Sequence, residues 1–271
     1  MIGGATLNQP STAKNTANSL SLKQCVGKWL VPRLPVNKHV FGHIRLELNA
    51  IWVRLMLLVH PRYRWAVSKL RVRRKILANL GCGPFGLAGW VNLDLFPHEN
   101  VTLRCDCRWR IPLADGSCAA IHVEHFFEHL NHEDERHEFL SECRRCLEDG
   151  GVLRIIVPDA ELFVRAYLAE GWEAFQNIAP PEERPEQSFI TKMDALNHVF
   201  LQGFEHYGGY DRQSLAHELI STGFFDVRAE SFRQGRFPGG CIDREQHRQY
   251  SLYMEAVKQR TIDVAHEGPL S

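Results

Sequence analysis

The stretch KILANLGCGPFGLAGWVNLDL, residues 75–95, decides the fold class of this chain. One apolar run ends at Leu80, glycines follow at positions 81 and 83, and a second apolar run ends at Asp94. Short apolar runs bounded by glycine predict buried strands with a tight turn between them. The interval leaves no room for the helix that holds pyrophosphate in a dinucleotide site. The turn therefore suits a ligand without phosphate groups.

Apolar runs and helical patterns alternate after this stretch. Strands are predicted at AAIHVEH (119–125), GGVLRIIVP (150–158), FFDVRAESF (224–232) and SLYMEAVK (251–258), and helices at 133–147, 160–169 and 211–223. Alternating units of this length predict an α/β fold, with a mostly parallel sheet and helices on both of its faces.

Composition divides the chain into segments. The polar composition of residues 1–22 predicts a disordered tail. A basic helical extension is predicted over 23–74, the main domain over 75–260, and a second tail over 261–271. Within the main domain, residues 176–210 carry PPEERPEQ without a period and predict a loop or inserted lid.

The charge of the chain is split between its two parts. Residues 1–75 hold fourteen basic residues and one acid, Glu47, so this stretch is +13 and the rest is −13. Such a split fits an extension docked on its own acidic domain, or an arm that meets anionic lipid or nucleic acid. The apolar residues 41–59 are interrupted by charges and too short to span a membrane. We expect docking, with weak peripheral membrane contact at most.

Eight cysteines and the absence of a signal-peptide pattern predict a reduced, cytoplasmic protein. The pairs Cys105 and Cys107, and Cys143 and Cys146, resemble halves of a zinc site. The second pair falls in a predicted helix and the first follows a strand, so we expect no metal there and no metal requirement for catalysis.

Several segments in order resemble the class I S-adenosylmethionine-dependent methyltransferases, in particular the methyltransferase type 11 branch. They are NLGCG, GWVNLDL, CDCRWRIPLADGSCAAIHVEHFFEHL and EFLSECRRCLEDGGVLRIIVPD, and the similarity extends over about residues 75–258. The resemblance implies a Rossmann-like sheet with a final antiparallel strand, S-adenosylmethionine as cofactor, and a small-molecule acceptor.

The resemblance also implies which residues bind the cofactor. Gly81 and Gly83 would line its methionine and ribose, Asp94 would accept hydrogen bonds from the ribose hydroxyls, and Asp106 would meet the adenine amino group. Glu124 and His125 would face the sulfonium. The full expected set is Leu80, Gly81, Cys82, Gly83, Asp94, Leu95, Asp106, Cys107, Glu124 and His125. Asn79 and Ala119 stand where the family often has acids, which puts one cofactor contact in doubt.

Candidate bases for the transfer are His125, His129 and His206, with Tyr207 and Tyr210 shaping the acceptor site. The expected reaction methylates a hydroxyl or amine of a small polar acceptor, such as a sugar, a glycan precursor or a secondary metabolite. The chain lacks the Asn-Pro-Pro-Tyr element of enzymes that methylate bases of nucleic acid, which argues against that partner.

Two other functions fit parts of the sequence. HFFEH, residues 125–129, matches the H-x-x-E-H string of a zinc metallopeptidase, in which His125 and His129 would bind zinc and Glu128 would activate water. The departure at Asn79 also fits a noncatalytic module that binds the cofactor without transferring its methyl group.

Overall fold

The computed structural model describes residues 37–179, 185–238 and 240–259 of the chain. The chain forms two compact units, residues 1–44 and 45–271. The described part of the first unit begins helix α2. The expected tails 1–22 and 261–271 lie outside the described residues. Within these ranges, no helix combines the length and the apolar character needed to cross a membrane.

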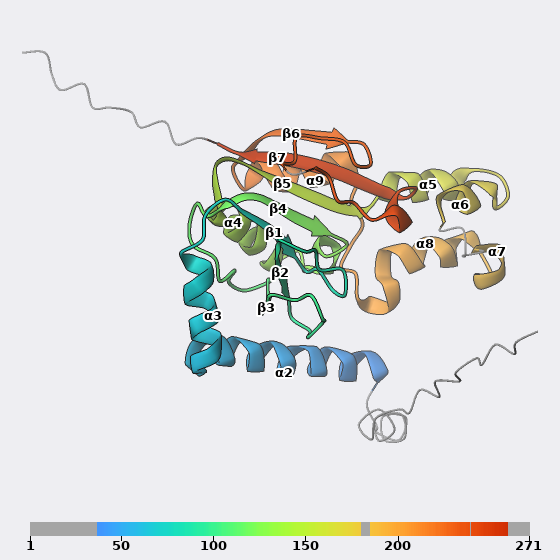
Figure 1. Cartoon of the computed structure of the whole chain (residues 1–271). Coiled ribbons are helices and arrows are strands. Elements are labelled where there is room, and N and C mark those ends of the chain that lie inside the picture. Colours follow the sequence, from blue (N-terminus) through green and yellow to red (C-terminus); the bar gives the residue numbers. More distant parts are fainter. Residues whose placement is uncertain (1–36, 180–184, 239, 260–271) are drawn as a thin grey trace, which may run out of the picture. The chain divides into compact units, whose positions relative to one another are not determined.

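The core of the second unit is a seven-stranded sheet in the order β3-β2-β1-β4-β5-β7-β6 (Figure 1). The strands are β1 (Ile76–Leu80), β2 (Val91–Asp94), β3 (Leu103–Arg104), β4 (Cys118–Glu124), β5 (Leu147–Pro158), β6 (Phe224–Glu230) and β7 (Ser251–Lys258). β7 lies antiparallel between β5 and β6, whereas the pairs from β3 to β5 are parallel. The predicted Rossmann-like sheet with a final antiparallel strand is confirmed.

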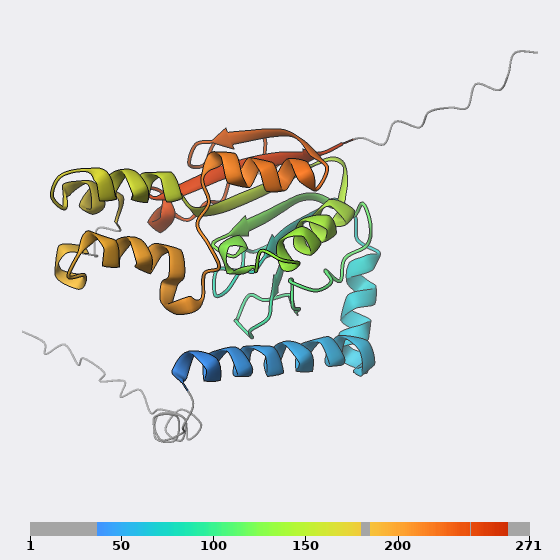
Figure 2. The ribbon, with the colours of Figure 1, turned by 180° about the vertical axis from the view of Figure 1, so that it is seen from behind.

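Helices and short helical turns connect and flank the strands. They are α2 (Lys38–Val59), α3 (Pro61–Arg71), η2 (Phe127–His129), α4 (Glu135–Cys146), α5 (Ala160–Leu168), α6 (Glu173–Ile178), α7 (Pro185–Ser188), α8 (Lys192–Leu201), η3 (Gln202–Phe204), α9 (Arg212–Ser221) and η4 (Glu245–His247). α4 and α9 cover one face of the sheet (Figure 2), where Leu80, Ile121 and Phe139 are fully buried. As predicted, no helix joins β1 to β2.

The opposite face is covered in its middle by residues from two connecting segments. Trp90 stacks on Phe237, with ring centroids 5.7 Å apart. Beside them the fully buried Arg154 of β5 forms ion pairs with Asp243 at 2.6 Å and Glu255 at 2.8 Å. A buried charge must be paired to be tolerated, so this network fixes the 231–243 segment on the sheet.

The region 176–210 is more helical than its sequence predicts. Thr191 and Asp194 form a capping box at the start of α8, which satisfies free amide groups there. Ala195 and Leu196 are buried in a second apolar cluster with Phe163 of α5. Packing of α8 against α5 stabilises the helix.

Helices α2 and α3 show that the predicted extension is helical over 38–59 and 61–71, and its expected part before residue 37 lies outside the described residues. Of the α2 residues that belong to the second unit, Ala50 and Val53 are completely buried. Leu48 and Leu55, which point elsewhere on the helix, are 62% and 50% exposed. The apolar stretch is therefore covered along one side only.

Candidate active site

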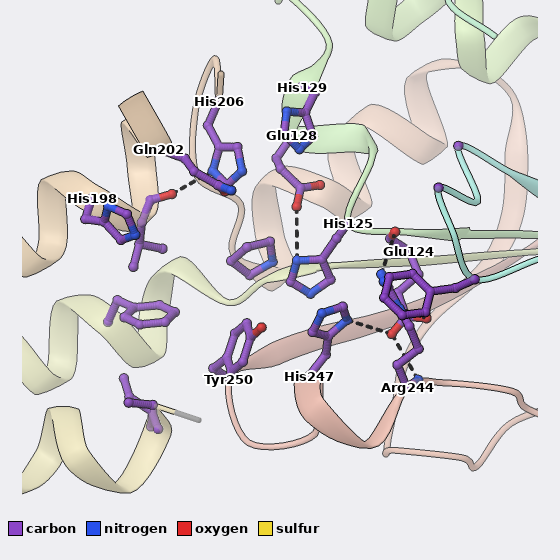
Figure 3. Close-up of a pocket in the computed structure, with 18 of the residues that line it drawn as sticks. Glu124, His125, Glu128, His129, His198, Gln202, His206, Arg244, His247 and Tyr250 are labelled. Atoms are coloured by element: carbon purple, nitrogen blue, oxygen red, sulfur yellow. Dashed lines mark hydrogen bonds and ion pairs between the residues drawn. The ribbon is translucent and has the colours of Figure 1, made fainter. Parts of the chain in front are cut away.

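A cavity of about 390 Å³ lies at the carboxyl ends of β1, β4 and β5 (Figure 3). Its lining comes from the glycine turn after β1, the 124–129 segment after β4, helices α5, α6 and α8, and the 244–250 segment. The carboxyl edge of a parallel sheet is where ligands bind in α/β folds. The cavity is therefore the candidate active site.

The glycine turn forms one wall of the cavity. Gly81 and Gly83 have φ values of +63° and +52°, which side chains with a Cβ rarely adopt. A Cβ on Gly81 would lie 2.4 Å from the ring of Phe126, so glycine is required there by packing. A Cβ on Gly83 would meet no atom within 4 Å. Gly83 therefore leaves open space, as a cradle for a ligand should.

Asp94, at the end of β2, holds this turn in place. Its carboxylate accepts hydrogen bonds from the amide of Gly83 at 2.8 Å and from the amide of Phe96 at 2.8 Å. The carboxylate lies outside the lining of the cavity. A direct contact between Asp94 and ribose stays a prediction, whereas its support of the turn is visible.

Asp106 is bound by two arginines. Arg54 of α2 and Arg108 contact its carboxylate at 2.6 and 3.0 Å. Burial alone would raise the pKa of Asp106, but the hydrogen bonds and positive charge of Arg108 and Arg54 outweigh burial and lower it. The expected contact to adenine would have to compete with these arginines.

The other expected cofactor residues are divided between the cavity and the core. Cys82, Glu124 and His125 line the cavity together with the two glycines. Leu80 and Cys107 are buried, and Leu95 is half-buried, outside the lining. Asn79 is also buried, and its amide lies 3.4 Å from Asn92 Oδ1.

Glu124 is the centre of a buried charged cluster at the tip of β4. Its carboxylate lies 2.9 Å from Nδ1 of His247, 3.0 Å from Nε of Arg244 and 3.3 Å from Nε2 of His122. Burial works against the charged form, but these hydrogen bonds and the nearby positive charge lower the pKa of Glu124 far below its ordinary value. Glu124 is therefore an anion that orients its neighbours.

His125 follows Glu124 with a φ of +53°, which is uncommon for a residue other than glycine. Its Nε2 lies 2.9 Å from Ser251 Oγ, and its ring lies over His247 with centroids 3.8 Å apart. Burial and the neighbouring His247 lower the pKa of His125 well below its usual value. His125 is neutral at neutral pH.

His129 and His206 meet at the cavity wall, with ring centroids 4.6 Å apart. Nδ1 of His129 donates to the carbonyl of Glu205 at 3.0 Å, and Nδ1 of His206 donates to the carbonyl of Val199 at 2.7 Å. Burial lowers the pKa of both rings, that of His206 to about 4. In a neutral ring with a proton on Nδ1, Nε2 keeps its lone pair.

Glu128 lies beside these histidines and is 1% exposed (Figure 3). Neither of its carboxylate oxygens has a hydrogen-bond partner. Nδ1 of His125 is 3.3 Å from Oε1, without hydrogen-bond geometry. Burial raises the pKa of Glu128 to about 8. An unpartnered buried carboxyl group calls for an explanation.

The three predicted bases therefore converge on one cavity, whereas the two predicted tyrosines do not. The amide of Tyr207 donates to the carbonyl of Glu128 at 2.9 Å, and the Tyr207 side chain is 52% exposed. Tyr210 is buried against Phe127, with Arg136 over its ring. Neither tyrosine lines the cavity.

Sequence reasoning missed the 244–250 segment of the cavity wall. Arg244, His247 and Tyr250 line the cavity from this segment, and His198 and Gln202 line it from the α8 region. The segment has no apolar period and lies far along the chain from the glycine turn. Its only signal is the density of polar residues in DREQHRQY just before the last strand.

The HFFEH string does not form the helix that its metallopeptidase interpretation needs. Phe127–His129 is a single 3₁₀ turn after β4. His125 and His129 therefore do not lie one α-helical turn apart on a shared face. The structure gives no support to that alternative.

Comparisons with known proteins give a family match and distant structural similarities. Residues 92–155 match the family model of the methyltransferase domain. No curated protein sequence matches this chain significantly.

Three solved structures illustrate the distant similarities. A possible exported protein from Bordetella parapertussis is 14% identical, with 73% of this chain and 67% of that chain covered and a TM-score of 0.41. A SAM-dependent methyltransferase from Archaeoglobus fulgidus is 15% identical, with 74% and 93% covered and a TM-score of 0.40. A possible histamine N-methyltransferase from Thermotoga maritima is 16% identical, with 81% and 96% covered and a TM-score of 0.40. Similarity at this level determines neither substrate nor partner.

The match of residues 92–155 begins in β2 and ends in β5. It therefore includes the strand β4 whose tip carries Glu124, and the 3₁₀ turn with Glu128 and His129. Residues 92–155 therefore carry the match to a methyltransferase domain, within the Rossmann-like strand order of the second unit.

Proposed function

We propose that this protein transfers a methyl group from S-adenosylmethionine to a hydroxyl or amine of a small polar acceptor. The observation that carries the proposal is the meeting of Gly83 with His129 and His206 in one cavity. Gly83 leaves open space for the cofactor, and the two imidazoles offer unprotonated Nε2 atoms for a proton of the acceptor.

The chain contributes binding and proton transfer to this reaction. When bound, S-adenosylmethionine supplies a methyl carbon that is electrophilic because it is attached to a sulfonium. Gly81 and Gly83 would hold that group close to the backbone, and Asp94 fixes their conformation. A hydroxyl acceptor loses its proton as its oxygen forms the new bond, and Nε2 of His129 or His206 is available to take it.

The acceptor side of the cavity fits a small, polar molecule. Polar lining residues include Gln202, Arg244 and His247, and apolar lining residues include Phe163 and Phe175 of α5 and α6. A few polar groups among apolar walls are typical of small-molecule sites. Sugars, glycan precursors and secondary metabolites belong to this class.

Incubation with radiolabelled S-adenosylmethionine and a metabolite extract tests the proposal. We expect label in a small molecule, and mass spectrometry of that product identifies the acceptor. Calorimetry with S-adenosylmethionine and S-adenosylhomocysteine is run in parallel. Binding of both without any labelled product would instead support a noncatalytic cofactor-binding module. A folded protein that binds neither would contradict the proposal.

A further inference from the structure

The carboxyl group of Glu128, which has no hydrogen-bond partner, lies close to the rings of His129 and His206. One ligand atom each from Glu128, His129 and His206 can be chosen so that all lie within 4.8 Å of one another. The first two residues belong to the turn after β4, and His206 comes from the segment before α9. Such spacing allows one ion to contact all three atoms.

The two histidines are oriented as metal ligands usually are. Each donates Nδ1–H to a backbone carbonyl, of Glu205 for His129 and of Val199 for His206. This second hydrogen bond fixes the tautomer and leaves the lone pair of Nε2 available to bind an ion. Hydrogen bonds of this kind to ligating histidines are common at metal sites.

Glu128 is the independent observation that points to a cation. The carboxyl group of Glu128 is 1% exposed and neither of its oxygens has a hydrogen-bond partner, so its ionised form needs a positive charge to balance it. Arg244 is engaged with Glu124 at 3.0 Å. The neighbouring His125 has its Nδ1 3.3 Å from Glu128 Oε1 without hydrogen-bond geometry. A divalent cation would satisfy both carboxylate oxygens.

We propose that Glu128, His129 and His206 bind a divalent first-row transition metal ion, of which Zn²⁺ is the typical example. Two imidazoles and one carboxylate are a common ligand set for such ions in sites that leave positions open. Because these ligands line the cavity, the open positions face the acceptor.

The role of the ion rests on the proposed methyl transfer, whereas its binding does not. A divalent ion lowers the pKa of a hydroxyl that reaches it, which makes the oxygen a better nucleophile. In the metal-loaded protein His129 and His206 are ligands, so the proton of the bound hydroxyl would pass to solvent water instead. The favoured acceptors then carry a hydroxyl beside a second oxygen, because two oxygens can bind one ion.

The site is distinct from the cysteine pairs in the sequence. Among the residues that the structure describes, the only His, Cys, Asp and Glu side chains that converge in this way are these three. Cys143 and Cys146 are buried, and burial raises the pKa of both thiols, so they are protonated. The lack of a metal at the cysteines stays a prediction, whereas the proposed site departs from the expectation that catalysis needs no metal.

Metal titration of the full-length protein tests the proposal. The protein is stripped with a chelator, dialysed, and titrated with Zn²⁺ by calorimetry and with Co²⁺ by visible absorption. We expect one tight equivalent of Zn²⁺ and Co²⁺ bands typical of mixed nitrogen and oxygen ligands. Glu128→Gln and His206→Gln should each weaken binding by roughly 10- to 100-fold or more.

His217→Gln is the matched control, because it removes an exposed histidine on α9 by the same substitution. It should bind as the unaltered protein does. Thermal melting with and without Zn²⁺ separates lost binding from lost folding, since an ion that binds the folded state raises the melting temperature. A folded Glu128→Gln variant should show a smaller rise, if any.

Two results would overturn the metal site. One is the lack of any saturable equivalent in the stripped protein, and the other is equal binding by the Glu128→Gln, His206→Gln and His217→Gln variants. Methyl transfer by a metal-free protein would support the proposed function and show that it does not need the metal site. Tight metal binding without methyl transfer to any acceptor would support the metal site and contradict the proposed function.

Discussion

The carboxylate of Asp106 accepts a hydrogen bond at 2.6 Å from the guanidinium of Arg54, 52 positions earlier in the chain. Two further contacts join the same helix to the domain, Glu47 to Arg108 at 2.6 Å and Asn49 to Arg104 at 2.8 Å. The part of α2 after Arg45 is therefore bound to the rest of the second unit through charged and polar groups.

Replacing Arg54 should destabilise the protein. Arg54→Met removes one of two charges on a buried carboxylate, and we expect a loss of about 1–3 kcal/mol, between the values for surface and buried pairs. Arg165→Met is the control, because its pair with Glu161 on α5 is exposed, and it should cost less than about 0.5 kcal/mol. Urea denaturation measures both. Equal losses of unfolding free energy in the two variants would show that the contact with Asp106 stabilises the protein no more than an exposed ion pair does.

Stability should fall on acidification. The folded protein lowers the pKa values of Asp106 and Glu124, so the unfolded chain binds more protons at acidic pH. Their contribution is complete above the unfolded pKa values of about 4 and is lost as pH falls from about 5 through the lower folded values. Denaturation at a series of pH values measures this slope. The Asp106→Asn variant should be less stable at pH 7, and its unfolding free energy should decline less steeply as pH falls. An unchanged slope would show that Asp106 does not contribute to the loss of stability in acid.

Filling the cradle at Gly83 should impair cofactor binding. Gly83→Ala and Gly89→Ala both place a Cβ at a positive φ where no atom lies within 4 Å, so each should cost about 1 kcal/mol of stability. Only Gly83 lines the cavity. We expect at least about tenfold weaker binding of S-adenosylhomocysteine by Gly83→Ala alone, a loss of about 1.4 kcal/mol. Calorimetry measures the affinity of each variant for S-adenosylhomocysteine. Equal affinities in the two variants would show that the cofactor does not bind at this turn.

Removing residues 1–74 should expose and weaken the domain. The deletion takes away Arg54 and the buried side of α2, so the melting temperature should fall and an apolar dye should bind. The pair of Arg54 with Asp106 favours docking of the extension, and under docking the intact protein should bind anionic vesicles only weakly. An unchanged melting temperature together with tight, salt-sensitive binding to vesicles would identify the extension as a membrane-recruitment arm.

The sequence alone was enough to predict the sheet and the glycine turn. Strand periodicity, the two glycines and the lack of room for a helix before Asp94 are local properties, and the structure confirms them. Helix α8 was missed because its stability depends on packing Ala195 and Leu196 against α5. Tertiary contacts of this kind override a weak local signal.

The site shows the same division between local and long-range information. His125 and His129 were predicted from the segment after a strand, because residues at a strand's carboxyl end reach the ligand-binding edge. That His206 approaches Glu128, and that Arg54 reaches Asp106, depends on how distant segments pack. The chain's periodicity determines its strands and helices, but only the folded arrangement brings together charged groups that desolvation forces to find partners.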